Sequence, residues 1–200
     1  MSERDEALRQ AFRVFNRGML LAWRLDLGRF LNRPWLGGQI MVITHTGRTS
    51  GARYRTPVNY ARYDGDVYCT AGFGRRTDWY RNVLAHPQVE VWLPGEQLGA
   101  PVGWWEATAT PVPDDDPDRL PRLREVLVAS GFAGRLDGFR PGMPDDALAT
   151  LTENLPLVRI GLGAARTGDG GPGDLAAVWP LAATVLAPLA GRGLLRRRTR

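Results

Sequence analysis

The sequence predicts a single α+β domain built on an antiparallel β-barrel or half-barrel of about six strands. The chain has 200 residues, which suffice for one domain with a sizeable core and are too few for two well-buried domains with linkers. About six β-rich runs separated by turn residues cross its middle, and few helical patterns interrupt them. Hydrophobic residues make up 44% and charged residues 24%, a composition typical of a globular chain, and no internal repeat is present.

The first thirty residues predict an amphipathic helix that ends before Pro34. The start SERD at residues 2–5 is acidic and has capping-box spacing, unlike the basic start of a signal peptide. Apolar residues then recur at helical spacing: Leu8, Phe12, Phe15, Met19, Trp23, Leu27 and Phe30. Two roles remain open for this helix. In the first role, the helix packs on its own domain or on a second subunit. In the second, it covers a substrate mouth or lies at a membrane surface, where Trp and Phe beside Arg are favoured.

Strand and helix patterns alternate through the middle of the chain. The predicted strands are residues 39–46, 53–63, 66–71, 89–93, 104–112 and 155–162. Asp64-Gly65 predicts a tight hairpin between the second and third strands. A short helix is predicted over residues 78–85, with Thr77 as its N-cap and His86-Pro87 as its stop. A second helix is predicted over residues 120–130, after a cluster of aspartates.

Residue counts exclude several kinds of site. Cys69 is the only cysteine, so the chain forms no internal disulfide and no multi-thiolate metal site, which fits a reducing compartment. His45 and His86 are the only histidines, too few for a histidine-rich zinc centre. All 26 basic residues are arginine, so neither a lysine Schiff base nor a P-loop lysine is available. We therefore expect no metal.

The formal net charge of +5 is carried by the two ends of the chain. Residues 1–33 contribute +3, residues 34–164 contribute −2 and residues 165–200 contribute +4. A nucleic-acid interface would need positive charge on the globular middle, so we expect no nucleic-acid partner. The chain divides into an N-terminal helix over residues 1–34, a barrel domain over 35–164, and a linker with an apolar, Arg-rich tail over 165–200.

The turn after the first strand carries the strongest functional signal. No carboxylate lies between His45 and Tyr63, and Arg48, Arg53 and Arg55 accompany two glycines and hydroxyl side chains there. Arginine forks match phosphate or carboxylate oxygens, and glycines let backbone N–H groups turn toward an anion. A second turn, AGFGRR at residues 71–76, adds two arginines before a helix N-terminus. Solvated arginines at two ordinary turns are the alternative, but the pair of turns favours a phosphate-bearing ligand.

Six short pieces follow one another in order between residues 39 and 162. They are TGRTSG at 46–51, RTPV at 55–58, DW at 78–79, RNVLA at 81–85, Pro87 and VEV at 89–91. Together they resemble the deazaflavin-dependent nitroreductase family, whose members are split β-barrels that use coenzyme F420 in place of FMN. The resemblance covers most of the predicted domain, and the order of the pieces is far more specific than any one of them.

The resemblance implies which residues bind the cofactor. In such proteins the first turn and the basic residues beyond it hold the acidic phosphate and polyglutamate tail, and the second turn lies along the deazaflavin ring. The cofactor-binding positions carried over are Arg48, Thr49, Ser50, Gly51, Arg53, Tyr54, Arg55, Thr56, Pro57, Ala71, Gly72, Phe73, Gly74, Trp79 and Asn82. The family often has basic residues where this chain has Thr49 and Tyr54. The flanking Arg53 and Arg55 are expected on the opposite face of the strand from Tyr54.

The implied reaction is hydride transfer from reduced deazaflavin to a small conjugated acceptor such as a quinone, an enone or a nitroaromatic. No catalytic side chain is predicted, because the cofactor supplies the reactive group. We expect Cys69 to be a small buried hydrophobe and His45 to be a hydrogen-bonded structural residue, with proton donation as its alternative role. Two other functions remain open: an FMN-binding reductase on the same barrel, and a non-catalytic cofactor-binding module at the membrane surface.

The C-terminal tail is the other unusual feature. Residues 168–173 predict a flexible linker, and residues 175–190 carry no charge before an arginine-rich end. This apolar run is too short to span a bilayer, and Pro180 and Pro188 interrupt it. It is either an anchor at the inner face of the cell membrane or an arm that is poorly ordered or packs on another subunit. We expect a cytoplasmic protein. The sequence leaves its oligomeric state open, with a homodimer that buries an open sheet edge as one arrangement.

Overall fold

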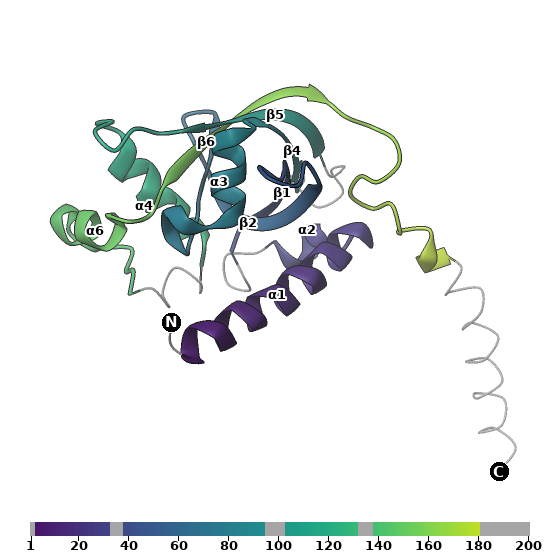
Figure 1. The fold of residues 1–200 in the computed structure, drawn as a ribbon, viewed down its shortest axis with the longest axis horizontal. Coiled ribbons are helices and arrows are strands. Elements are labelled where there is room, and N and C mark those ends of the chain that lie inside the picture. The colour runs from purple at the N-terminus through teal and green to yellow at the C-terminus, as the bar shows by residue number, and fades with distance from the viewer. Residues whose placement is uncertain (1–2, 33–37, 95–102, 132–137, 181–200) are drawn as a thin grey trace, which may run out of the picture.

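The computed structural model describes residues 3–32, 38–94, 103–131 and 138–180. These residues form a closed antiparallel barrel with helices packed on its outside (Figure 1). The strand order around the barrel is β1-β2-β3-β6-β5-β4. This architecture confirms the predicted α+β class and the antiparallel barrel.

The strands lie where turn chemistry and apolar alternation place them. They are β1 (Ile40–Thr46), β2 (Arg53–Tyr63), β3 (Asp66–Thr70), β4 (Gln88–Leu93), β5 (Gly103–Pro111) and β6 (Leu157–Ala165). Every predicted strand is present, with ends that differ by at most three residues. Met41 and Ile43 of β1 point into the barrel with Val91 and Ile160, while Val42, between them, faces outward.

The helices lie outside the barrel. They are α1 (Glu3–Arg24), α2 (Gly28–Leu31), α3 (Asp78–Ala85), α4 (Arg119–Ala129) and α6 (Asp145–Thr152), with a 3-10 turn, η1 (Gly74–Arg76), before α3. The predicted helix over residues 78–85 agrees with α3, whereas α6 was not predicted from the sequence. Thr77 occupies the N-cap position of α3, but its hydroxyl donates to the Gly74 carbonyl at 2.7 Å instead of capping the helix. Among the described residues, no helix is both long and apolar enough to cross a membrane.

The N-terminal helix is shorter than predicted. It ends at Arg24, and Asp26 adopts the left-handed conformation with φ of 60° before α2 begins. The helix ends early because the following residues pack closely over the buried Trp23 ring. A Cβ on Gly28 would lie 2.6 Å from Trp23 Cδ2. A straight helix continuing to Pro34 could not fold back over this ring. Ser2 of the predicted capping box lies outside the described residues.

The end of α1 packs on the outer face of the barrel. Trp23 is 1% exposed, and the centroid of its ring lies 6.5 Å from that of Trp92 on β4. Val42 of β1 and Trp104 of β5 complete this outer cluster. The helix therefore packs on its own domain here, and Trp23 is buried in a structural contact instead of covering a cavity.

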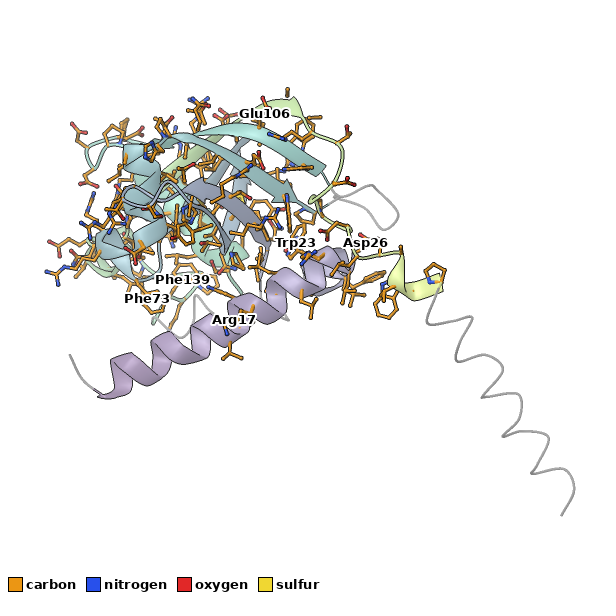
Figure 2. The ribbon with its side chains drawn as sticks, turned by 45° about the vertical axis from the view of Figure 1, so that its right-hand side comes forward. Arg17, Trp23, Asp26, Phe73, Glu106 and Phe139 are labelled. Atoms are coloured by element: carbon orange, nitrogen blue, oxygen red, sulfur yellow. The ribbon has the colours of Figure 1, made fainter. Side chains whose placement is uncertain are left out.

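After β6, residues 166–179 return along the barrel to the end of α1, and we call them the return segment (Figures 1 and 2). Gly173 N–H donates to the Trp23 carbonyl at 3.0 Å. Asp174 accepts from Arg24 Nε at 2.9 Å, in a forked ion pair. The stretch predicted as a flexible linker is therefore tied to α1.

The barrel closes through the pairing of β1 with β4 and of β3 with β6. Every described strand therefore has a neighbour on both sides, and the open sheet edge that motivated a homodimer is absent from the described strands. The homodimer remains a prediction, but an open sheet edge no longer supports it.

Candidate functional site

A cavity of about 740 Å³ lies at the mouth of the barrel, bounded by α1, the β1–β2 hairpin and the start of α3. This volume is within the range of small-molecule sites. The residues that line it are Asn16, His45, Gly47, Arg48, Thr49, Ser50, Tyr54, Arg55, Thr56, Phe73, Arg76, Thr77, Asp78, Trp79 and Asn82. They come from segments up to 66 residues apart, so the fold and not the local sequence assembles the cavity.

Many of the predicted cofactor-binding residues meet at this cavity. Those that line it are Arg48, Thr49, Ser50, Tyr54, Arg55, Thr56, Phe73, Trp79 and Asn82. Those that do not are Gly51, Arg53, Pro57, Ala71, Gly72 and Gly74. Residues that the prediction did not include are Asn16, His45, Gly47, Arg76, Thr77 and Asp78. Gly47 and Arg76 lie inside the two turn motifs, so their motifs could have indicated them, whereas Asn16 reaches the cavity only through the packing of α1.

The β1–β2 turn is folded tightly on itself. Gly47 N–H donates to the Ala52 carbonyl at 2.8 Å, and Gly51, with φ of 67°, donates to the Gly47 carbonyl at 2.9 Å. A Cβ on Gly47 would lie 2.6 Å from Ser50 Oγ and 2.7 Å from Tyr54 Cε2. The Ser50 and Tyr54 hydroxyls are 3.2 Å apart. Glycine at position 47 therefore lets the Tyr54 ring and the turn close over the end of β1.

Arg48 is anchored at the cavity by α3. Its backbone N–H and its Nη1 both donate to Asn82 Oδ1, at 3.1 Å and 3.0 Å. The same Nη1 donates to Asp78 Oδ1 at 3.0 Å. A guanidinium carries five N–H donors, so Arg48 is fixed in place and keeps donors for a ligand.

His45 lies at the inner wall of the cavity and is only 4% exposed. Its Nδ1 is 3.2 Å from Asn82 Nδ2, its Nε2 is 3.1 Å from Thr56 Oγ1, and its ring stacks on Tyr54 with centroids 5.9 Å apart. Burial lowers the pKa of His45 to about 4, against a smaller opposing effect of Asp78. The ring is therefore neutral near pH 7, which fits the predicted structural role better than proton donation.

Arg53 and Arg55, at the start of β2, lie on the outer face, opposite Tyr54, as strand alternation predicts. Arg53 Nη2 lies 2.6 Å from Glu90 Oε2, so this guanidinium is paired away from the cavity. Arg55 stacks on Trp92, with its Cζ 4.6 Å from the ring centroid, and donates to the Gly170 carbonyl of the return segment at 2.7 Å. Burial lowers the pKa of Arg55, but the side chain still reaches the edge of the cavity.

The lining of the cavity combines positive charge with aromatic side chains. Arg48, Arg55 and Arg76 line it, and Asp78 is the one carboxylate among its described lining residues. Arg76 makes no ion pair within the described part of the chain. Tyr54, Phe73 and Trp79 add aromatic surface, and Figure 2 shows Phe73 on the side of the barrel away from the return segment. Fold and site together define a β-barrel protein whose cavity combines guanidinium groups with aromatic side chains, a lining that suits a flat, anionic ligand.

Comparison with known proteins identifies the family. The model of the F420H(2)-dependent quinone reductase family matches residues 24–136. The chain belongs to this family, is an F420-dependent oxidoreductase, and has coenzyme F420 as its cofactor. This confirms the resemblance that the order of the motifs indicated.

Several solved structures are similar to this chain at low sequence identity. A structure of an F420-H2 dependent reductase is 21% identical, with 60% of this chain and 92% of that chain covered and a TM-score of 0.40. The putative pyridoxamine 5'-phosphate oxidase of Listeria innocua is 12% identical, with 64% and 86% covered and a TM-score of 0.44. A conserved hypothetical protein of Mycobacterium tuberculosis is 17% identical, with 64% and 73% covered and a TM-score of 0.42. No curated protein matches the sequence.

The residues present fit F420. A deazaflavin is a flat ring system, and its phosphate and glutamate tail is acidic. The cavity offers aromatic side chains for the ring and guanidinium groups for the tail, and its turn is closed around a glycine that a Cβ would disrupt. The chemistry of the donor set therefore agrees with the cofactor of the family.

Proposed function

We propose that this chain transfers a hydride from reduced F420 to a quinone within the cavity bounded by α1, the β1–β2 hairpin and α3. The observation that carries the proposal is the convergence of three guanidinium groups and three aromatic side chains on one cavity of about 740 Å³. Reduced F420, when bound, supplies the hydride from C5 of its ring. The chain contributes by binding and orienting the two ring systems and by excluding water.

Each part of the cofactor has a set of side chains that suits it. Arg48 and Arg76 line the cavity beside the tight turn, and Arg55 reaches its edge from β2. We assign the acidic tail to these three. Tyr54 and Trp79 border the same cavity, and we assign the flat ring to them.

Binding is tested by titrating the purified chain with oxidised F420 and, separately, with FMN. We expect F420 to bind in preference to FMN, and Arg48→Ala and Arg55→Ala to weaken F420 binding by about tenfold or more, because each removes charge-assisted hydrogen bonds. Arg81→Ala is the matched control, since Arg81 is exposed on α3 and does not line the cavity. Unchanged affinity in both cavity variants, with circular dichroism showing intact folding, would overturn the assignment.

The acceptor is tested by turnover. The description of the family favours a quinone, which takes up one hydride and one proton to become a hydroquinone. We expect reduced F420 to be oxidised faster with quinones than with enones or nitroaromatics, followed by the absorbance of F420. Tight binding of F420 without turnover of any acceptor would instead favour a non-catalytic cofactor-binding module.

We further propose that the protein contacts a membrane surface, where lipid-soluble quinones reside. Val14 and Leu21 on α1, and Val178 and Trp179 at the end of the return segment, are exposed apolar side chains. The sequence that follows is apolar and then rich in arginine, with Arg196, Arg197 and Arg198 consecutive.

Sedimentation with lipid vesicles tests this contact. We expect binding to anionic vesicles and little binding to phosphatidylcholine vesicles, and replacement of the three consecutive arginines with Gln to abolish the difference. A triple replacement of Arg62, Arg81 and Arg140 with Gln, three arginines elsewhere on the chain, is the matched control. Equal sedimentation of the tail variant and the unaltered chain would contradict the proposal.

The remaining organisation is also a proposal. We retain the division into residues 1–34, a cofactor-binding domain over 35–164 and a tail over 165–200, together with a cytoplasmic location and a homodimer. Light scattering coupled to size-exclusion chromatography measures the oligomeric state directly, and a mass of one chain would exclude the homodimer.

A further inference from the structure

A series of hydrogen bonds runs from Arg48 to Thr56 at the cavity. Arg48 determines which atom donates in each bond of the series. The backbone N–H and the guanidinium of Arg48 can only donate, and both donate to Asn82 Oδ1. The amide of Asn82 is therefore oriented, because turning it over would bring its NH₂ group against these donors. Asn82 Nδ2 is then the atom that faces His45 Nδ1, at 3.2 Å.

The tautomer of His45 follows from this orientation. An amide nitrogen can only donate, so His45 Nδ1 accepts and carries no hydrogen. The neutral ring then carries its hydrogen on Nε2, which donates to Thr56 Oγ1 at 3.1 Å. A doubly protonated ring would place two donors face to face at Asn82, an arrangement that agrees with the lowered pKa of His45.

Thr56 is the last residue in this series of hydrogen bonds. Its Oγ1 accepts from His45, and within the described part of the molecule it makes no other hydrogen bond, so its own hydrogen is available to the cavity that it lines. We propose that Arg48, Asn82 and His45 form a positioning relay that makes the Thr56 hydroxyl a directed hydrogen-bond donor to a carbonyl oxygen of a ring bound in the cavity.

The proposal rests on the proposed function only for the identity of the ring. Deazaflavins and quinones both carry carbonyl oxygens on their rings, so the shared chemistry is a flat ring with a hydrogen-bond acceptor at its edge. The relay itself is present in the ligand-free protein, because it consists only of residues of the protein.

The tautomer is tested on the protein alone. Nitrogen-15 NMR of the histidine ring separates the two neutral tautomers, and we expect the form with hydrogen on Nε2. In Asn82→Asp a carboxylate accepts from Arg48 but has no hydrogen to donate to His45, so the ring hydrogen should move to Nδ1. The form with hydrogen on Nδ1 in the unaltered chain would overturn the relay, whether or not F420 binds.

The hydroxyl donor is tested with the ligands. Thr56→Val should weaken binding of oxidised F420, or raise the KM for the quinone, by about tenfold, and Thr56→Ser should restore it to within about twofold. A change in F420 affinity assigns the carbonyl to the cofactor, and a change in KM alone assigns it to the quinone. Thr110→Val, at an exposed threonine of β5, is the matched control.

Asn82→Asp tests whether the direction of the relay matters, and the KM for the quinone is its readout, because a carboxylate beside Arg48 also weakens binding of the acidic cofactor tail. The variant retains the Thr56 hydroxyl but reverses the donor in the bond to His45, so we expect a loss similar to that of Thr56→Val. Unchanged F420 affinity and KM in Thr56→Val, with an unchanged KM in Asn82→Asp, would overturn the proposal. Failure of the unaltered chain to bind F420 would instead refute the proposed function, and the tautomer measurement would still decide the relay.

Discussion

Acidification should destabilise this fold through His45. The ring is neutral and buried in the folded chain, with a pKa of about 4, whereas a histidine in the unfolded chain has a pKa near 6.5. Between these values the unfolded chain binds the extra proton. The stability that the neutral ring contributes is therefore present above about pH 6.5 and is lost as the pH falls toward 4.

The magnitude follows from the difference between the two pKa values. The separation is about 2.5 units, and each unit corresponds to about 1.4 kcal/mol, so His45 accounts for a loss of at most about 3–4 kcal/mol. Asp78 opposes the effect, while Asn82 and Thr56, which contact the ring nitrogens, have no titratable side chain. Burial is therefore the main cause of the effect.

Urea denaturation of the unaltered chain and of His45→Gln measures this contribution. The free energy of unfolding should fall by about 2–3 kcal/mol more in the unaltered chain than in the variant between about pH 7 and about pH 4.5. Both proteins keep His86 and every carboxylate, so the difference between the two curves isolates His45. Parallel curves would refute the reasoning, even if the variant is less stable at every pH.

Three further predictions concern packing and access. Trp23→Ala should lower the free energy of unfolding by about 3–5 kcal/mol, measured by urea denaturation, because the ring is buried against Trp92. Gly47→Ala should weaken F420 binding in titration by about tenfold or more, since its Cβ would lie 2.6 Å from Ser50 Oγ; Gly142→Ala, with nothing within 4 Å, is the control. Cys69 should resist iodoacetamide until the chain is unfolded, because it is buried and burial raises the pKa of its thiol; rapid labelling of the folded chain would contradict this.

Much of the local structure could be predicted from the sequence. β2 and α3 were predicted with their observed ends, because Asp64-Gly65 and His86-Pro87 constrain the backbone over a few residues whatever the rest of the chain does. α6 carries a comparable signal, Pro144 followed by Asp145 and Asp146 at its start, although no helix was predicted there.

The candidate site could be predicted only in part. The turn motif indicated Arg48 and Ser50, and both line the cavity. It also indicated Arg53, which pairs with Glu90 on the outer face because neighbouring strands bring that carboxylate to it. Which arginine of a motif meets a ligand depends on the face of the sheet and on its neighbours.

The sequence by itself determined the antiparallel barrel, the turn that holds Arg48 and the family, since strand periodicity, turn residues and motif order are properties of short segments. Only the tertiary structure decided that α1 ends at Arg24 and the chain turns at Asp26 beside Trp23, and that Asn82 meets His45 across 37 residues. These contacts join segments far apart in the chain. Their geometry depends on how complete elements pack together, which no local pattern of residues records.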